Sequence, residues 1–514
     1  MAEVRMVSRR CGGRRSLLLR GSPALLAVVL LLAGALPYVA GAQRSYLSYL
    51  VLAERLDAPG EAVAADAVRA AGGQVVQGYP QIGAVLAYAA DGAFAGRLRG
   101  RPGIAAVGAT RTAPVPDPPG ALGGAGDFGR STASEAVQGL ESDDTPTVPD
   151  PGEHGAWNLA MMGAPAAQPA RGVLPTAVAT GRSGPSAAAL RRVTVAVLDS
   201  GVDDTHPDLR DAVNPAASAS CADGRPDPRF GAWRPDPGVT ESGHGTHVAG
   251  IIGAARGVIG VAPGVRIAAV RLLGPLGQYY PENIVCGLLW AADHGASAIN
   301  DSYFADPWKY NCPEDPDQAA IILAVGRAVA YAQQRGALVV ASAGNDAQDL
   351  TAFRTDERSP NDRLSGPAQN RWLGTECIRL PGELPGVLAI SAVDRSGAIA
   401  SYSNVGDGRI ALAAPGGDPD GGPGEAIVSD WPGGRFAALA GTSMSAAHVT
   451  GAIAVAAADH PGWGPDRLRE LLLAQARTDC PPGLGPGSGP GVGPGVGHCP
   501  DRRAYGAGIV TLPH

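Results

Sequence analysis

Apolar runs alternate with helix-length segments through residues 154–514, and this alternation predicts the fold. Five runs are almost wholly apolar, as strands covered on both faces must be. They lie at 193–198, 267–272, 296–300, 338–343 and 387–393. Residues 282–294 and 318–334 lie between them and have helical length and periodicity. The pattern predicts an α/β domain with a parallel β-sheet flanked by helices.

A shorter pattern precedes this domain. Its strand and helix signals follow the order β-α-β-β-α-β, which is the split β-α-β arrangement. The segments are 46–52, 59–71, 74–79, 82–88, 91–99 and 104–108. Asp91 is available to cap the second helix. Residues 43–110 are therefore predicted to form a small ferredoxin-like α+β domain.

The segments outside these two domains have different compositions. Residues 111–153 are rich in Pro, Gly, Asp and Ser, which predicts an exposed linker. Residues 1–42 combine a basic start, an apolar run at 24–36 and a small-residue end, as a secretion signal does. Extended to Ala42, the run approaches membrane-spanning length, so an uncleaved anchor is the alternative. Arg14-Arg15 suggests a twin-arginine route, but the apolar core favours the general one.

Composition and cysteine usage agree with an exported globular chain. The 514 residues are 45% hydrophobic with a net charge of −7, and dispersed basic residues give no sign of a nucleic-acid partner. Six cysteines remain after the signal segment, which suggests disulfides but allows fifteen pairings. Our first choice is Cys480–Cys499, followed by Cys221–Cys286 and Cys312–Cys377. If the thiols are free, the cysteines serve as small buried hydrophobes.

Three further segments carry the groups of a Ser-His-Asp hydrolase. Asp199 ends the first apolar run, His244 begins His-Gly-Thr-His-Val-Ala-Gly, and Ser443 precedes a small-residue helical run at 446–458. A serine hydroxyl needs a base to take its proton near neutral pH. His244 is the candidate base, and Asp199 would hold its tautomer and stabilise its cation.

These segments resemble the motifs of the subtilisin-like serine proteases, the peptidase S8 family, in the same Asp, His, Ser order. The fourth motif, Ala341-Ser342-Ala343-Gly344-Asn345, resembles the stretch that supplies the oxyanion asparagine. The resemblance implies a secreted serine endopeptidase that works through an acyl-enzyme. Asn345 and the backbone N–H of Ser443 would bind the oxyanion.

The resemblance also implies how the chain matures. Residues 43–110 resemble an inhibitor-I9-like propeptide, which assists folding and blocks the cleft until self-processing removes it. Residues 154–514 would then be the catalytic domain. An unrelated accessory domain of the same topology is the alternative for residues 43–110. The expected partners are protein or peptide substrates and the propeptide itself. A monomer with no stable membrane association is expected.

The substrate cleft is assigned by the same resemblance. Ser302, Tyr303, Ala343 and Gly344 would line it, with Gly274 on the opposite wall. Ordinary edge strands remain the alternative, because pairing with a substrate needs an accessible edge. Two neighbouring positions affect the expected shape and charge of the cleft. Phe304 stands where relatives commonly have glycine, and Asp346 could bias the pocket toward basic or neutral side chains.

Two further departures concern the nucleophile and calcium. Ala447 stands where the family usually has proline, which could let the nucleophile turn relax and change the rate. Asp208 matches a calcium ligand of many relatives, but residues 254–259 are too short and lack carboxylates. We therefore favour a turn acid at Asp208, and expect no metal or cofactor apart from a low-ranked calcium alternative.

Two other classes of function are weighed. A metal-dependent hydrolase would use His244 and His247 with Asp199 as third ligand, although no glutamate base lies between the histidines. A catalytically idle binding protein would leave Ser443 unlabelled by an active-site reagent. The complete triad and the propeptide pattern favour the protease.

Overall fold

The computed structural model describes most of the chain. The described residues are 46–115, 156–163, 185–239, 242–274, 277–362, 369–421, 424–478 and 501–513. The expected signal, residues 116–153 of the expected linker and the Cys480–Cys499 pair lie outside them. The described residues belong to one compact unit, Ser45–His514.

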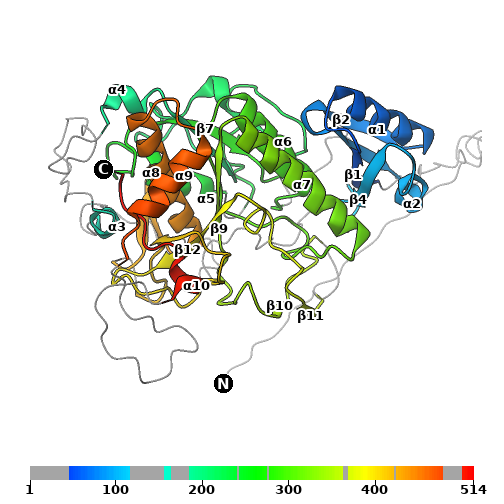
Figure 1. The fold of residues 1–514 in the computed structure, drawn as a ribbon. Helices are drawn as coiled ribbons and strands as arrows, with labels where there is room; N and C mark the ends of the chain where they lie inside the picture. The colour runs from blue at the N-terminus through cyan, green and yellow to red at the C-terminus, as the bar shows by residue number, and fades with distance from the viewer. Residues whose placement is uncertain are drawn as a thin grey trace, which may run out of the picture. The chain divides into compact units, whose positions relative to one another are not determined.

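A seven-stranded sheet forms the centre of the larger domain (Figure 1). Its strands run in the order β13-β12-β9-β8-β5-β7-β6, and every neighbouring pair is parallel. Their bounds are β5 (Thr194–Asp199), β6 (Ala219–Ser220), β7 (Arg266–Arg271), β8 (Ala298–Asp301), β9 (Leu338–Ser342), β12 (Leu388–Val393) and β13 (Leu412–Pro415). The five apolar runs are confirmed as strands. The short strands β6 and β13 add the two edges.

Alternate residues of β5 pack into two different layers. Val195 and Val197 join the core that contains residues of α5 (His244–Gly253), α8 (Thr442–Asp459) and α9 (Pro465–Gln475). Ala196 and Leu198 join the core that contains α6 (Pro281–Asp293) and α7 (Pro316–Gln334). Helices therefore cover both faces of the sheet, which confirms the predicted α/β class.

The N-terminal segment folds in the predicted β-α-β-β-α-β order. Its elements are β1 (Leu47–Ala53), α1 (Ala58–Ala70), β2 (Gln74–Tyr79), β3 (Ala84–Ala89), α2 (Phe94–Leu98) and β4 (Ile104–Ala109), with a 3-10 turn η1 (Pro80–Ile82). The antiparallel sheet has the order β2-β3-β1-β4. The predicted cap at Asp91 is wrong, because α2 begins only at Phe94. Asp91 instead accepts from the Ala93 N–H at 2.9 Å and pairs with Arg97.

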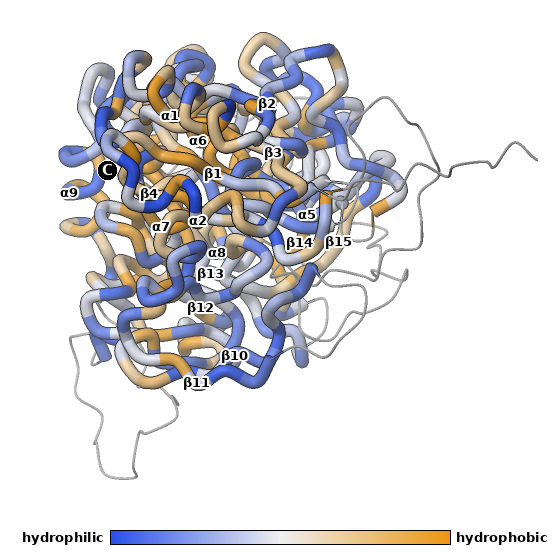
Figure 2. Tube along the Cα trace, turned by 90° about the vertical axis from the view of Figure 1, so that its right-hand side faces the viewer, coloured by the Kyte–Doolittle hydropathy of each residue, from blue (hydrophilic) through white to orange (hydrophobic). Residues whose placement is uncertain are grey.

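This small sheet is apolar on both faces. Tyr49 and Val51 of β1 pack with residues of α1 and α2. Leu50 and Leu52, which point the other way, pack in the same core as α6 and α7. Figure 2 shows hydrophobic stretches on β1 and α6. The N-terminal domain therefore adds a layer to the larger domain, outside the helices that cover one face of its sheet.

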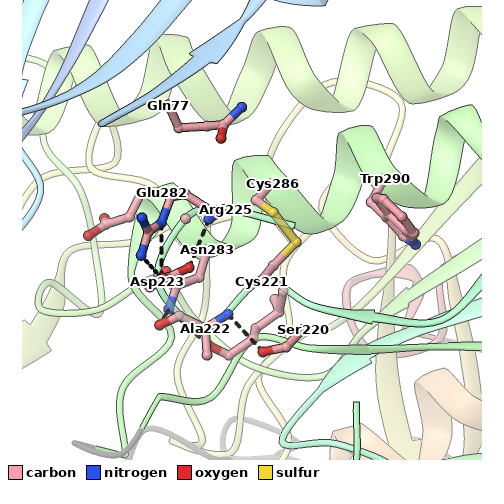
Figure 3. Close-up of a disulfide and its surroundings, with 12 residues drawn as sticks. Gln77, Ser220, Cys221, Ala222, Asp223, Arg225, Glu282, Asn283, Cys286 and Trp290 are labelled. Atoms are coloured by element: carbon pink, nitrogen blue, oxygen red, sulfur yellow. Dashed lines mark hydrogen bonds and ion pairs between the residues drawn. A yellow bond between two sulfur atoms is a disulfide. The ribbon is translucent and has the colours of Figure 1, made fainter. Parts of the chain in front are cut away.

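The remaining elements are short. They are α3 (Trp157–Met161), α4 (Ala187–Leu190), η3 (Pro215–Ala217), β10 (Arg354–Asp356), β11 (Arg371–Leu373), β14 (Ile427–Trp431), β15 (Arg435–Leu439) and α10 (Arg502–Tyr505). Disulfides join Cys221 to Cys286 and Cys312 to Cys377. These are the two pairings that the sequence analysis placed after Cys480–Cys499. The first joins the segment after β6 to α6 (Figure 3). Among the described residues, no helix combines the length and the hydropathy that membrane crossing requires.

Candidate active site

The sheet topology brings the candidate groups to one edge. β5 ends at Asp199, the neighbouring β8 leads into Ser302, and β9 leads into Asn345. Parallel neighbours expose their carboxyl ends at the same edge, where functional groups of such folds gather. These three residues therefore reach one location although they are far apart in sequence.

Asp199 and His244 are in direct contact. The imidazole Nδ1 lies 2.9 Å from Asp199 Oδ1 and 3.0 Å from Oδ2, and both side chains have 0% exposure. The Ser200 N–H donates to Oδ1 at 2.6 Å, and the Tyr279 hydroxyl lies 3.4 Å from the same oxygen. A carboxylate facing Nδ1 favours the tautomer with its proton on Nδ1, so Nε2 is the basic nitrogen.

The glycine after His244 explains why these two elements approach so closely. A Cβ on Gly245 would lie 2.5 Å from the Gly201 carbonyl oxygen and 2.9 Å from Asp199 Cβ. Ser200 Oγ accepts from the Gly245 N–H at 3.0 Å and donates to the Ser242 carbonyl at 2.8 Å. The end of β5 and the start of α5 are thereby joined, which fixes the imidazole beside the carboxylate.

Ser443 is the second residue of α8 and lies against the end of β8. Its hydroxyl donates to the Ser302 carbonyl at 3.3 Å, and the Ser302 hydroxyl donates to the Ser443 carbonyl at the same distance. Asn300 Nδ2 donates to Ser302 Oγ at 2.8 Å, and Thr450 Oγ1 donates to Asn300 Oδ1 at 3.0 Å. This network holds the beginning of α8 on the sheet edge that carries Asp199.

Asn345 is held by the residue before Ser443. Its Oδ1 accepts from the Thr442 N–H at 3.0 Å and from Thr442 Oγ1 at 2.8 Å. Thr442 Oγ1 also accepts from the Gly344 N–H at 3.1 Å. Because the amide oxygen is used on the Thr442 side, the NH₂ group points away from Thr442. Gly344 has φ +110°, and a Cβ there would lie 2.3 Å from Asn404 Nδ2.

The expected cleft residues lie at the same sheet edge, and all of them are buried. Ser302 contacts Ser443, and Ala343 and Gly344 lead directly into Asn345. Gly274 follows β7, which pairs with β5 on the side opposite β8, so it lies across Asp199 from Ser302 in the order of the sheet. Tyr303 is buried: its ring stacks on Tyr279 at 4.8 Å.

Asp301 is a buried acid that the sequence reasoning did not single out. Tyr303 donates its hydroxyl to Asp301 Oδ1 at 2.7 Å, and the aspartate has 0% exposure. Burial raises the pKa of Asp301 to about 7; the Tyr303 bond opposes the rise, and Asp199 adds to it. The sequence does contain a signal for this residue, because an acid ends an apolar strand that neighbours the strand of Asp199.

Asp346 already has cationic partners. It forms an ion pair with Lys309, the only lysine of the chain, and both side chains are nearly buried. Burial favours the neutral acid, but Lys309 and Arg379 outweigh it and hold the pKa of Asp346 below its ordinary value. The Arg379 guanidinium also lies 5.0 Å above the Phe304 ring. These cations compensate the carboxylate, which removes the reason to expect a basic preference from Asp346.

The other motif histidines serve the fold. His247 Nε2 lies 3.1 Å from the carbonyls of both Ile427 and Ala437, to which it donates. Burial first and His244 second lower the pKa of His247 to about 3. Its Nε2 therefore holds the β14–β15 hairpin and is not directed at a metal shared with His244. Burial likewise lowers the pKa of His448 to about 4.

The structure bears on the expectations at three individual positions. Arg111 was predicted to begin an exposed linker, but it is 8% exposed, because it pairs with Glu282. Ala447 is the sixth residue of α8, so it lies beyond the first helical turn. Asp208 accepts the N–H groups of Gly257 and Val258 at 2.8–2.9 Å. These bonds tie the short 254–259 segment back to the acid.

Comparisons with known proteins agree with this geometry. The model of the subtilase family matches residues 191–505. Subtilisin BL of Lederbergia lenta is 32% identical over 283 residues, which are 54% of this chain and 81% of that protein.

Two solved structures share the fold. The epidermin leader peptide processing serine protease of Staphylococcus aureus has a TM-score of 0.60 at 20% identity, covering 91% of this chain and 97% of its own. Fervidolysin of Fervidobacterium pennivorans has a TM-score of 0.55 at 22% identity, covering 92% of this chain and 61% of its own.

Proposed function

Because this chain belongs to the subtilase family and is a serine-type endopeptidase, we propose that it cleaves peptide bonds through an acyl-enzyme on Ser443. The observation that carries the proposal is the buried Asp199–His244 contact at the sheet edge where α8 presents Ser443. Each group comes from a different element, and the sheet order supports their convergence.

The first chemical step follows from these contacts. The Ser443 hydroxyl turns from the Ser302 carbonyl toward His244 Nε2, which takes its proton as Oγ attacks the substrate carbonyl. Asp199 stabilises the resulting imidazolium. His244 then gives the proton to the leaving amine, and water releases the acyl group by the same steps in reverse. This chemistry requires no cofactor.

The developing oxyanion needs donors that are in place before the reaction. The Asn345 NH₂ group and the Ser443 backbone N–H are the proposed pair. Thr442 supports this role, because its two bonds to Asn345 Oδ1 fix the orientation of the amide. One such donor contributes about 2.7–4 kcal/mol of transition-state stabilisation.

We assign residues 43–110 the role of an intramolecular inhibitor and folding aid, preceded by a signal at 1–42 and followed by the catalytic domain at 154–514. Contacts between the domains support this role. Arg111 Nε donates to Glu282 Oε1 at 2.8 Å, Ser48 Oγ lies 3.2 Å from the same oxygen, and the Tyr79 hydroxyl donates to the Gly224 carbonyl at 2.6 Å. Figure 3 shows Glu282 at the start of α6, near the Cys221–Cys286 disulfide.

Secretion and action on proteins or peptides complete the proposal. The two disulfides support an oxidising compartment, where such bonds form and persist. The docked N-terminal domain supports synthesis as a precursor, which separates folding from activity. A monomer suffices, because every proposed catalytic group comes from one chain.

Self-processing of the purified precursor tests the proposal. The wild-type chain should shorten from its N-terminus on incubation, and Ser443→Ala should remain uncleaved because the acyl-enzyme cannot form. Ser445→Ala is the matched control, since Ser445 is also buried in α8 and its hydroxyl donates to the Ala414 carbonyl at 3.0 Å. N-terminal sequencing of the fragments would contradict the proposal if Ser443→Ala were cut at the same bond and rate as wild type.

A further inference from the structure

A second group of reactive side chains lies apart from Ser443. It consists of His206, Asp208 and Asp430, one potential ligand atom from each lying within 4.8 Å of the others. Two of these residues follow β5, and Asp430 belongs to β14. Their exposures are 1%, 4% and 0%, so the group is closed from solvent.

Asp430 is the member whose burial needs an explanation. Among the described residues, no N–H group and no hydroxyl donates to either of its carboxylate oxygens, and its side-chain hydrogen bond is with another acid, Asp208. Leaving an ionised carboxylate in such a place is costly unless an opposite charge or a ligand compensates it. The fold holds this acid without the protein donors that a purely structural carboxylate normally has.

His206 has the tautomer that a metal ligand requires. Its Nε2 lies 3.0 Å from the Arg435 carbonyl, which can only accept, so Nε2 carries the proton. Nδ1 then lies 3.6 Å from Asp430 Oδ1 and accepts one long bond, 3.3 Å, from the Asp208 N–H. Metal-bound histidines are typically oriented in this way, by a hydrogen bond from the second ring nitrogen to a carbonyl or carboxylate.

Asp208 is fixed by backbone donors. The Gly257 and Val258 N–H groups hold its carboxylate, which keeps lone pairs for a further partner. Phe436 packs its ring against His206 with centroids 5.5 Å apart, and it also lies where a Cβ of Gly257 would be. The group is therefore a buried set of one nitrogen and two carboxylates.

The separation of the ligand atoms matches a shared ion. His206 Nδ1 and Asp430 Oδ1 lie 3.6 Å apart, which is too long for a hydrogen bond. Tetrahedral bonds of 2.0–2.2 Å to one zinc ion would separate such atoms by about 3.4 Å. A dication would also neutralise the two carboxylates beside a neutral imidazole.

We propose that His206, Asp208 and Asp430 bind one divalent cation of the zinc class as a structural site. Calcium does not fit, because it prefers six or more oxygen ligands and this group offers a nitrogen and two carboxylates. The ion would tie the connection after β5 to the β14–β15 hairpin. Because the ligands are buried, it enters during folding and exchanges slowly in the native state.

Metal analysis of the full chain tests the site. The chain is produced with ZnCl₂, dialysed without chelator, and its zinc is measured by mass spectrometry. Wild type should hold about one zinc per chain, since the three side chains form a single zinc site, and Asp430→Asn should fall to the background level. Asp211→Asn is the matched control, because this neighbouring acid is exposed and pairs with Arg256 outside the group; it should keep its zinc.

A second measurement covers the case in which Asp430→Asn does not fold. Wild type is refolded with EDTA, with ZnCl₂ or with CaCl₂, and its thermal midpoint is compared. Zinc should raise the midpoint over EDTA, and calcium should not reproduce the shift. The proposal is overturned if wild type carries no zinc above background, if zinc and EDTA give the same midpoint, or if Asp211→Asn loses zinc as Asp430→Asn does.

Discussion

At the scale of single residues, burial decides which charges can act. Asp199 and His244 have no exposed surface, so their mutual contact replaces water as the partner of each. Asp301 lies on the neighbouring strand, and it accepts a hydrogen bond from the Tyr303 hydroxyl instead of facing a histidine. Burial raises its pKa to about 7, and Asp199 contributes to the rise.

Asp301→Asn should stabilise the protein at alkaline pH and not at acid pH. The folded-state pKa of about 7 lies above the ordinary value of 3.8, so wild type loses stability as pH rises from 4 to 7 and then levels off. Asparagine does not titrate and can still accept from Tyr303. The gain at pH 8 is at most about 4 kcal/mol at 1.36 kcal/mol per pKa unit.

Urea unfolding at pH 4.5 and pH 8 in a Ser443→Ala background would measure this difference without self-digestion. Asp211→Asn serves as an exposed control. A stability difference between Asp301→Asn and its parent that is the same at both pH values would refute the assignment.

At the scale of elements, the proposed oxyanion site depends on the junction between β9 and α8. β9 leads into Gly344 and Asn345, while α8 begins at Thr442, and three hydrogen bonds connect the two ends. Neither element alone could orient the amide. The glycine permits the backbone turn, and the threonine selects the direction of the NH₂ group.

Asn345→Ala should lower kcat about 10²–10³-fold and leave KM nearly unchanged, because the lost donor acts on charge that develops only in the transition state. Thr442→Val should lower kcat by less, since it loosens the amide without removing it. Steady-state kinetics on a peptide substrate would test both. An Asn345→Ala enzyme with unchanged kcat and raised KM would show that the residue binds substrate in the ground state.

How far the sequence predicted this arrangement depended on the length of each signal. Long apolar runs such as 193–198 identified the sheet, and Asp199 and Asn345 followed two of its strands. β6 has only two residues, and apolar and polar residues alternate too little in the β14–β15 hairpin to distinguish it from a loop. Neither was therefore predicted.

Predictions about individual residues failed where the interaction partner comes from a distant part of the chain. Asp346 seemed a pocket charge because Lys309, 37 positions away, is not adjacent to it in sequence. Arg111 was predicted to be exposed because the composition of residues 111–153 is that of a linker. Its ion pair with Glu282 instead holds it in a buried position. Apolar residues on both faces of 47–53 were the readable sign that another layer covers this strand.

At the scale of the whole molecule, the N-terminal domain shares its core with the catalytic domain. One face of β1 packs in the α6–α7 core, and Arg111 and Glu282 form an ion pair with 8% and 1% side-chain exposure at the boundary. Removing one partner of a buried pair leaves an uncompensated charge. The boundary therefore depends on this pair far more than on its exposed contacts.

Glu282→Gln should loosen the docked domain, at a cost of about 3–5 kcal/mol for breaking a buried pair. In a Ser443→Ala precursor, added trypsin should cleave within residues 46–115 faster than in the parent. Asp293→Asn is the control, since Asp293 accepts from Gln81 across the same boundary at an exposed position. Equal cleavage rates for Glu282→Gln and its parent would show that the pair does not hold the domain.

The most direct test of the central claim is the site and rate of labelling by a fluorophosphonate. The account predicts a single adduct on the peptide that contains Ser443, and a labelling rate that falls steeply in His244→Ala because the base that activates the hydroxyl is gone. An adduct on another serine, or labelling of Ser443 at an unchanged rate without His244, would contradict the triad.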